Sequence, residues 1–156
     1  ATRRLLETAD SAAWVLYNPL GSGRVAVIDR VASWSVSGTL GLGLALLCAV
    51  SKENQTTIPV DVALSIKTNL LAGGPNTVMV FGVNLTLVVA TPAWCVVDSR
   101  SQVAAVEVGA GLSSKAEFAG TRAVPPGHVF GVTHLSPAGT TPLFGVSIEY
   151  HELDYP

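Results

Sequence analysis

Apolar and polar residues alternate along several stretches of the chain, which is the pattern of a β-strand with one buried face. In the most regular stretch, 143–152, the apolar side chains of one face are Phe144, Val146, Ile148 and Tyr150. Residues 58–67 and 78–90 show the same period of two. We predict a strand in each stretch, and we expect the strand at 143–152 to lie centrally in a sheet over the core.

Further strands are predicted where the alternation is less regular. Residues 12–18 are apolar on both faces, which indicates a strand buried between two layers. The other short strands are expected at Leu44–Val50, Ala93–Val97, Val103–Val108, Lys115–Ala119 and Val129–His134.

The stretch 24–36 changes phase along its length. Its first apolar residues lie on one face of the predicted strand and its last ones on the other: Val25 and Val27, then Trp34 and Val36. One inserted residue reverses the facing of every residue that follows it. We therefore predict a β-bulge near Asp29 and Arg30.

Segments rich in Gly, Pro, Asn and Ser separate these strands, and no segment has a sustained helical period. Many short strands at intervals of about 8–12 residues are typical of a β-sandwich or barrel. We predict an all-β fold, an antiparallel, jelly-roll-like β-sandwich with about 8 to 10 short strands.

One separating segment, Gly21-Ser22-Gly23, has the small residues of a phosphate-binding loop. Such a loop binds phosphate because a helix follows it and presents free N–H groups. Here the strand-like residues 24–28 follow instead. We interpret the two glycines as part of a tight turn between strands.

The chain has 156 residues, the length of one domain. We expect residues 11–156 to form a single β-sandwich domain, preceded by a flexible or docking N-terminal arm at 1–10. Arg3 and Arg4 are the candidate assembly residues, because they could anchor the arm on an acidic neighbouring protein. The alternative is a solvated arm without a partner.

Charged residues make up only 13% of the chain, against about 25% in a typical soluble domain. A surface so poor in charge indicates that other subunits cover part of it. We therefore expect a homo-oligomer, most simply a trimer.

Charge and hydropathy also exclude two classes of partner. The net charge of −2 argues against a nucleic acid, whose phosphates attract basic surfaces. Two long uncharged stretches, 31–51 and 68–97, are interrupted by small polar residues, Gly or Pro, so we expect no membrane partner.

The histidines and carboxylates do not form a recognisable site. His128 and His134 lie on one predicted strand at about 20 Å from each other, too far apart to bind one metal ion. Glu149 and His151 share a strand face and could share a cation, but a solvated strand end is the preferred interpretation. The remaining carboxylates are scattered. We expect no catalytic residues, no cofactor and no metal.

Sulfur and indole side chains stand in apolar surroundings and are expected to be buried. Cys48 and Cys95 are interpreted as buried thiols, although a disulfide between them stays open. For Trp14, Trp34 and Trp94, packing in the core is favoured over stacking on a sugar.

Three segments resemble parts of a known group of proteins. YNPLGSGRVAVIDRVASWSVSGT resembles a segment of small structural proteins of tailed-bacteriophage virions, and VPPGHVFGV and TTPLFGVSIEYHE resemble the last two strands of that group. The matches are spread over most of the chain, but each is short and consists largely of turns. The resemblance implies a jelly-roll-like virion building block: a head decoration, fibre-base or tail-associated protein. It carries over no catalytic residues.

The expected function is thus that of a non-enzymatic virion structural protein, which assembles with itself and with other virion proteins such as capsid or tail components. The alternative is a carbohydrate- or receptor-binding β-sandwich module, which would show exposed aromatic residues beside carboxylates. An enzyme built on a β-sandwich would instead show a polar pocket.

Overall fold

The computed structural model describes residues 5–6, 11–39, 43–52, 77–86, 94–102, 113–135 and 140–156. They form nine strands and no helix: β1 (Leu5–Leu6), β2 (Ser11–Tyr17), β3 (Arg24–Thr39), β4 (Gly43–Lys52), β5 (Val80–Thr86), β6 (Trp94–Gln102), β7 (Ser113–Val124), β8 (Val129–Leu135) and β9 (Thr140–Asp154). No helix in these residues is long and apolar enough to cross a membrane.

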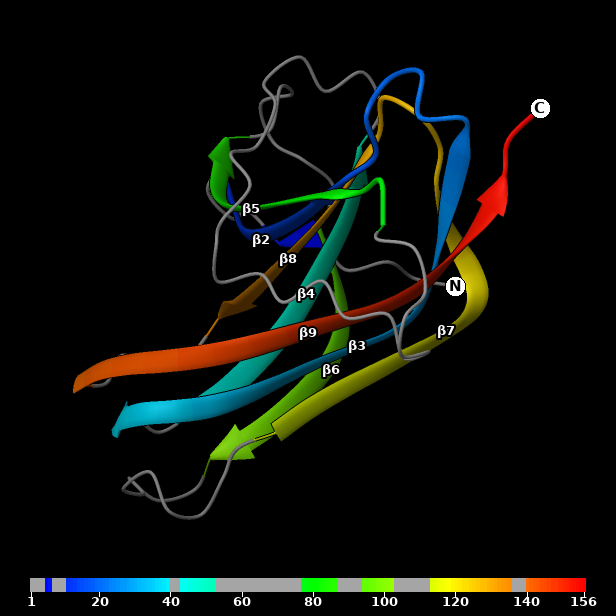
Figure 1. The fold of residues 1–156 in the computed structure, drawn as a ribbon. Helices are drawn as coiled ribbons and strands as arrows, with labels where there is room; N and C mark the ends of the chain where they lie inside the picture. Colours follow the sequence, from blue (N-terminus) through cyan, green and yellow to red (C-terminus); the bar gives the residue numbers. More distant parts are fainter. Residues whose placement is uncertain are drawn as a thin grey trace, which may run out of the picture.

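Two antiparallel sheets pack face to face (Figure 1). The larger sheet has the order β1-β6-β4-β8-β2-β5, and the smaller has the order β7-β3-β9. The predicted antiparallel β-sandwich is therefore confirmed. Two strands are longer than the expected short ones, since β3 has 16 residues and β9 has 15.

The strands pair in a nested order. β4 pairs with β6, β3 with β7 and β2 with β8, so that each earlier strand meets a later one. The chain thus resembles a long hairpin that is rolled up, with its successive strand pairs alternating between the two sheets. This pairing is the jelly-roll-like feature of the fold.

The main core lies between the sheets. Leu16, Leu47 and Phe130 of the larger sheet pack there against Ile28 and Val31 of the smaller one. A second buried cluster lies on the opposite face of the larger sheet and consists of Val15, Tyr17, Cys48, Val50 and Val129. Neighbouring residues of β2 belong to different clusters, which confirms the prediction that this strand is buried on both faces.

The predicted bulge in β3 is also confirmed. Its register against both β7 and β9 shifts between Ile28 and Arg30, so that Asp29 is left without a partner in either ladder. Ala26 and Ile28 face the core before the bulge, and Val31 and Ser33 face it afterwards. The bulge therefore keeps one face of a 16-residue strand on the core despite the change of phase.

The position of β9 differs from the prediction. Val146, Ile148 and Tyr150 pack against the core as expected. However, among the described strands β9 lies at the edge of the smaller sheet, so the expectation of a central position is wrong for the part of the chain that the structure describes. The central strand is β3, because both of its edges pair. The alternation in β9 determined which face is buried, but not which strands lie beside it.

The other predicted strands agree with β4 to β8 where the structure describes them. β6 and β7 extend beyond the predicted stretches Ala93–Val97 and Lys115–Ala119. The strands predicted at 58–67 and 103–108 lie outside the described residues.

Side-chain hydrogen bonds join the two sheets along both sides of the sandwich. On one side Asp98 of β6 accepts hydrogen bonds from the backbone N–H groups of Ser99 and Lys115, the latter on β7. On the other side Thr77 accepts a hydrogen bond from the Tyr150 hydroxyl at 2.7 Å and donates one to Glu152. These contacts fix how the smaller sheet lies on the larger one.

Two turns lock together at one end of the sandwich through Asn18, whose side chain is fully buried. Its amide nitrogen donates to the carbonyl oxygens of Arg24 and Val124, both at 2.7 Å. Its side-chain oxygen accepts a hydrogen bond from the Ser22 hydroxyl at 2.6 Å. The predicted turn at Gly21-Ser22-Gly23 is confirmed, because both glycines have positive φ angles and β3 follows directly.

The two described residues of the N-terminal arm belong to the larger sheet. Leu5 and Leu6 form the edge strand β1, which pairs with Cys95 and Trp94 of β6. The predicted arm at 1–10 therefore contributes two residues to the larger sheet. Arg3 and Arg4 lie outside the described residues.

Candidate interaction surface

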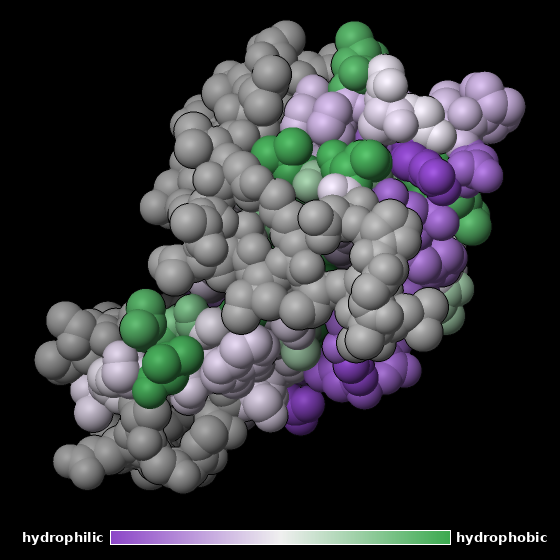
Figure 2. Space-filling model, viewed as in Figure 1, coloured by the Kyte–Doolittle hydropathy of each residue, from purple (hydrophilic) through white to green (hydrophobic). Residues whose placement is uncertain are grey.

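The outward face of the smaller sheet has exposed apolar residues at one end and charged residues along its middle, and further exposed apolar residues lie around the turn before β3. Figure 2 shows hydrophobic residues gathered at the lower left, where β3 and β9 project in Figure 1, and hydrophilic residues on the right. We call the apolar end of this face the tip patch; it consists of Trp34, Val36 and Leu143, whose exposed fractions lie between 43% and 55%.

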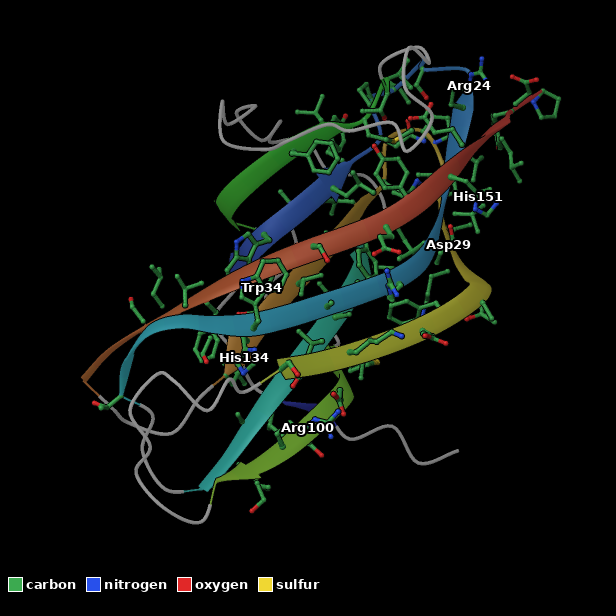
Figure 3. All side chains as sticks on the ribbon, turned by 60° about the horizontal axis from the view of Figure 1, so that its bottom comes forward. Arg24, Asp29, Trp34, Arg100, His134 and His151 are labelled. Atoms are coloured by element: carbon green, nitrogen blue, oxygen red, sulfur yellow. The ribbon has the colours of Figure 1, made fainter. Side chains whose placement is uncertain are left out.

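Trp34 lies flat across the neighbouring strand. It faces Gly145 in the register of β3 and β9, and its indole ring reaches over β9 (Figure 3). A Cβ atom built on Gly145 would come within 2.6 Å of the ring atom Cε2. Only glycine therefore leaves room for the ring in this position. The ring thus covers the backbone of β9 at Gly145, and Trp34 as a whole remains 43% exposed.

The tip patch is carried by a two-stranded ribbon. β7 pairs with β3 only as far as Trp34, which lies opposite Ser113. Beyond this point, the described partners of β3 are residues of β9, with Ser37 opposite Leu143 and Thr39 opposite Thr140. A two-stranded ribbon is marginally stable in water by itself. Exposed apolar residues on such a ribbon indicate a surface that gains stability when it is covered.

The charged middle of the face is paired within the chain. Arg30 binds Glu149 on β9, and this hydrogen bond raises the pKa of Arg30. Lys115 binds Glu117 on β7, which lowers the pKa of Glu117. These exposed pairs contribute little to stability, but the charges of their four side chains are neutralised within the chain.

The two residues that were predicted to be a solvated strand end have partners on β3. Glu149 binds Arg30, and Nδ1 of His151 lies 2.9 Å from Oδ2 of Asp29, the bulged residue (Figure 3). The two side chains thus belong to separate pairs. Among the described residues, no group of three or more His, Cys, Asp or Glu side chains is arranged to hold a metal ion.

A second group of exposed apolar residues, which we call the base patch, lies around the turn before β3 and the end of β9. It consists of Leu20, Leu153 and Tyr155, whose exposed fractions lie between 50% and 82%. Leu20 belongs to the turn before β3, and the backbone N–H of Tyr155 donates to the carbonyl oxygen of Gly23 in the same turn, at 2.9 Å. At about 3.3 Å per residue, Leu153 lies about 30 Å from Leu143 along β9.

A partly buried histidine lies between the sheets below the tip patch. His134 of β8 stacks on Phe144 of β9, with ring centroids 3.9 Å apart, and its Nδ1 lies 2.8 Å from the hydroxyl of Ser33. Burial lowers the pKa of His134 to about 4, with Asp98 acting in the opposite direction. Its Nε2 and the hydroxyl of Ser114, which faces Ser33 in the register, have no hydrogen-bond partner among the described residues.

The Ser33–His134 contact has the residue types of a nucleophile and its base, but its surroundings do not suit catalysis. Ser33 is only 1% exposed, so a substrate cannot approach its hydroxyl in this conformation. Asp98, the nearby acid, accepts hydrogen bonds from backbone N–H groups instead of orienting the imidazole. The contact gives Nδ1 of the partly buried His134 a hydrogen-bond partner between the two sheets. The expectation that both histidines share one strand is wrong for His128, which lies in the turn before β8, while His134 belongs to β8.

The cysteines lie on opposite faces of the larger sheet. Cys95 faces Ala49 in the register, and Ala49 belongs to the core between the sheets, whereas Cys48 belongs to the second cluster. The two form no disulfide with each other. Burial raises the pKa of Cys48 to about 11, so its thiol stays protonated at neutral pH.

The tip patch was missed by the sequence analysis, which favoured packing of Trp34 in the core. That expectation is wrong for Trp34; Trp14 is half-buried, and the side chain of Trp94 lies outside the described residues. The sequence did contain a sign that Trp34 faces outward, namely the phase change at Asp29. Once the bulge is counted, Trp34 falls on the same outward face as Arg30 and opposite to Val31 and Ser33.

No family model, no curated protein and no solved structure matches the chain. Its function is therefore inferred from the surfaces and contacts described above.

Proposed function

We propose that the chain is a non-enzymatic structural protein of a virion, which assembles as a homo-oligomer on a phage capsid or tail in a decoration, cement or fibre-base role. The observation that carries this proposal is the presence of two exposed apolar patches, the tip patch and the base patch, on a chain with only 13% charged residues. Exposed apolar patches of this kind mark contacts with other proteins.

The fold and the interior are consistent with such a role. A nested β-sandwich presents broad, rigid faces, which suits a building block. The buried Ser33–His134 contact is part of the packing and leaves no accessible nucleophile at that place. Two segments that resemble phage structural proteins meet at Asn18, whose amide ties the turn before β3 to the end of β7.

The arm at 1–10 would provide the attachment to other virion proteins. β1 lies at the edge of the larger sheet, beside β6. Arg3 and Arg4 would then dock on an acidic surface of a capsid or tail component. Neither a nucleic acid nor a membrane is part of this proposal.

Mass spectrometry of particles purified from the source tests the proposed function. We expect the chain in many copies per particle, in constant ratio to the major capsid protein through repeated density-gradient purification. A ratio that falls with each gradient would identify a contaminant and would contradict a virion role.

A carbohydrate- or receptor-binding module is the second candidate, and the exposed ring of Trp34 favours it. Sugars stack on such a ring, but their hydroxyl groups also need carboxylates or amides nearby. The register neighbours of Trp34 are Ser113 and Gly145, which provide neither. Binding to a glycan array that is abolished by Trp34→Ala and retained by Leu44→Ala, at another exposed apolar position, would favour this candidate.

A further inference from the structure

His134 of β8 connects the larger sheet to the two-stranded ribbon of β3 and β9. Its Nδ1 lies 2.8 Å from the hydroxyl of Ser33 on β3, and its ring stacks on Phe144 of β9 with the centroids 3.9 Å apart. Ser33 directly precedes Trp34, where the pairing of β3 with β7 ends. His134 and Trp34 therefore lie at the same end of the sandwich (Figure 3).

The surroundings of His134 suit a neutral ring. A protonated imidazole donates from both nitrogens, but Nε2 is buried and has no hydrogen-bond partner among the described residues. The neighbours on the other strands are uncharged: Ser33 on β3, its register partner Ser114 on β7, Phe144 on β9, and Leu47 opposite on β4. A charge on the ring would lose hydration without gaining a carboxylate partner.

The charged group that acts on His134 is Asp98 of β6, and it is already engaged. Asp98 pairs with Leu47, which pairs with His134, so the carboxylate lies two strands away, at about 10 Å. It accepts a hydrogen bond from the backbone N–H of Lys115 at 2.9 Å, and Arg100 lies 3.4 Å from it. At this distance Asp98 favours protonation of His134 only weakly.

Other contacts hold the rest of the smaller sheet. Along β9, the hydroxyl of Tyr150 donates to Thr77, about 20 Å from Phe144. At the end that carries the base patch, the buried amide of Asn18 joins the start of β3 to the end of β7. None of these three side chains, Tyr150, Thr77 or Asn18, takes up a proton in mild acid. Protonation of His134 therefore acts on the tip end.

We infer that the tip of the sandwich opens reversibly in mild acid, when His134 takes up a proton and the ribbon of β3 and β9 separates from β8. Opening lets water hydrate both ring nitrogens, while the locked turns at Asn18 stay closed. Such a partial opening requires less free energy than unfolding of the whole chain. This inference goes beyond the proposed function and does not depend on it.

The size of the effect follows from the two states of the ring. In the closed state burial lowers the pKa of His134 from 6.5 to about 4, and in the opened state the hydrated ring regains its ordinary pKa. Between these two pKa values the opened state binds more protons, so the ratio of opened to closed molecules rises as the pH falls. From pH 7.5 to pH 5 this ratio should rise about 30-fold.

Hydrogen exchange measured by mass spectrometry tests the inference on the full chain. Exchange at pH 7.5 and pH 5 is divided by the intrinsic chemical rate at each pH, and peptides from the tip, 33–37 and 143–147, are compared with base peptides, 15–18 and 24–28. We expect protection of the tip peptides to fall about 30-fold and to recover at pH 7.5.

Low concentrations of urea separate partial opening from global unfolding. Partial opening exposes little surface, so exchange of the tip peptides at pH 5 should be faster than that of the base peptides and should change little in about 1 M urea. Equal exchange and equal urea dependence at both ends would overturn the inference, because the chain would then open only by unfolding. Protection that does not recover at pH 7.5 would overturn the reversible opening.

Variants assign the effect to one ring. His134→Asn can still bond Ser33 but takes up no proton, so its tip protection should change less than about twofold between the two pH values. His151→Asn, at an exposed histidine of β9, is the control and should keep the full change. A full change in His134→Asn would overturn the inference. Circular dichroism verifies folding, and the urea comparison on the unaltered chain decides the matter if His134→Asn does not fold.

Discussion

The side-chain amide of Asn18 donates a hydrogen bond to the carbonyl oxygen of Val124, at 2.7 Å and 106 residues further along the chain. A second hydrogen bond, to the carbonyl of Arg24, completes the buried amide. Removing the amide leaves two carbonyl groups without this donor, and an unsatisfied buried group costs about 1–3 kcal/mol. We expect Asn18→Ala to lower the free energy of unfolding by about 2–4 kcal/mol in urea denaturation.

Ser22→Ala is the matched control, since it removes a hydrogen bond to the same asparagine from a more exposed position. Its cost should be about 1 kcal/mol. Equal effects of the two variants would mean that the Asn18 amide does not hold the turns together.

Truncating a side chain should change the free energy of unfolding by different amounts on the two faces of β9. Ile148 packs against the core, so Ile148→Ala should lower the free energy of unfolding by about 2–3 kcal/mol. His151 is exposed, and its contact with Asp29 lies at the surface, so His151→Ala should change it by about 0.5 kcal/mol or less. Chemical denaturation of both variants measures the difference. A larger effect of His151→Ala would show that the faces are assigned the wrong way round.

His134 should make the fold sensitive to mild acid. Its ordinary pKa of 6.5 applies to the unfolded chain, whereas burial lowers the pKa of folded His134 to about 4. Between these values the unfolded state binds more protons, so the free energy of unfolding falls as the pH falls. We expect a loss of about 2 kcal/mol between pH 6.5 and pH 4, measured by urea denaturation at each pH.

His134→Asn tests the origin of this loss, because its amide can bond Ser33 but does not titrate. The variant should be nearly independent of pH in this window, whereas His151→Asn should behave like the unaltered chain. An unchanged slope in His134→Asn would assign the acid sensitivity to other groups.

Gly145 should control the position of the Trp34 ring. A methyl group at Gly145 would meet the ring at 2.6 Å, so Gly145→Ala should displace the indole towards solvent. In protein labelled with 5-fluorotryptophan, the resonance of one of the three tryptophans should shift in the ¹⁹F NMR spectrum. Ser147→Ala, two residues further on the same strand, should leave all three in place. The prediction fails if both spectra match that of the unaltered chain.

Removal of residues 1–10 should have a small effect on the isolated domain. Of the arm, the structure describes Leu5 and Leu6, which form the two-residue edge strand β1. We expect the thermal midpoint in calorimetry to fall by about 5 °C or less, while attachment to particles is weakened. Complete loss of folding would show instead that the arm is essential to the core.

The features that the sequence predicted correctly depend on neighbouring residues. The alternation in β9, the tight turn at Gly21 and Gly23, and the bulge at Asp29 each follow from the local order of side chains and from the requirement that one face be buried. The two buried faces of β2 were predicted for the same reason.

The features that could not be predicted depend on residues far apart in the chain. The edge position of β9 depends on which strands pair with β3 on each side. His134 is partly buried because it meets Ser33 and Phe144 from the other sheet. Trp34 is exposed because β7 ends beside it and Gly145 accommodates its ring. None of these partners is marked by sequence spacing.

The nested order of strand pairs also indicates the order in which these pairs form during folding. Leu47 pairs with Asp98, Val31 with Ala116 and Tyr17 with Val129, so the loop closed by each successive pair encloses the previous one. The entropy lost on closing a loop rises slowly with its length, so an inner pair that forms first shortens the loop that the next pair must close. Chains dominated by such distant pairings fold in about milliseconds to seconds. We therefore expect slow refolding that starts near β4 and β6 and ends when β2 meets β8, with the locked turns at Asn18 among the last contacts to form.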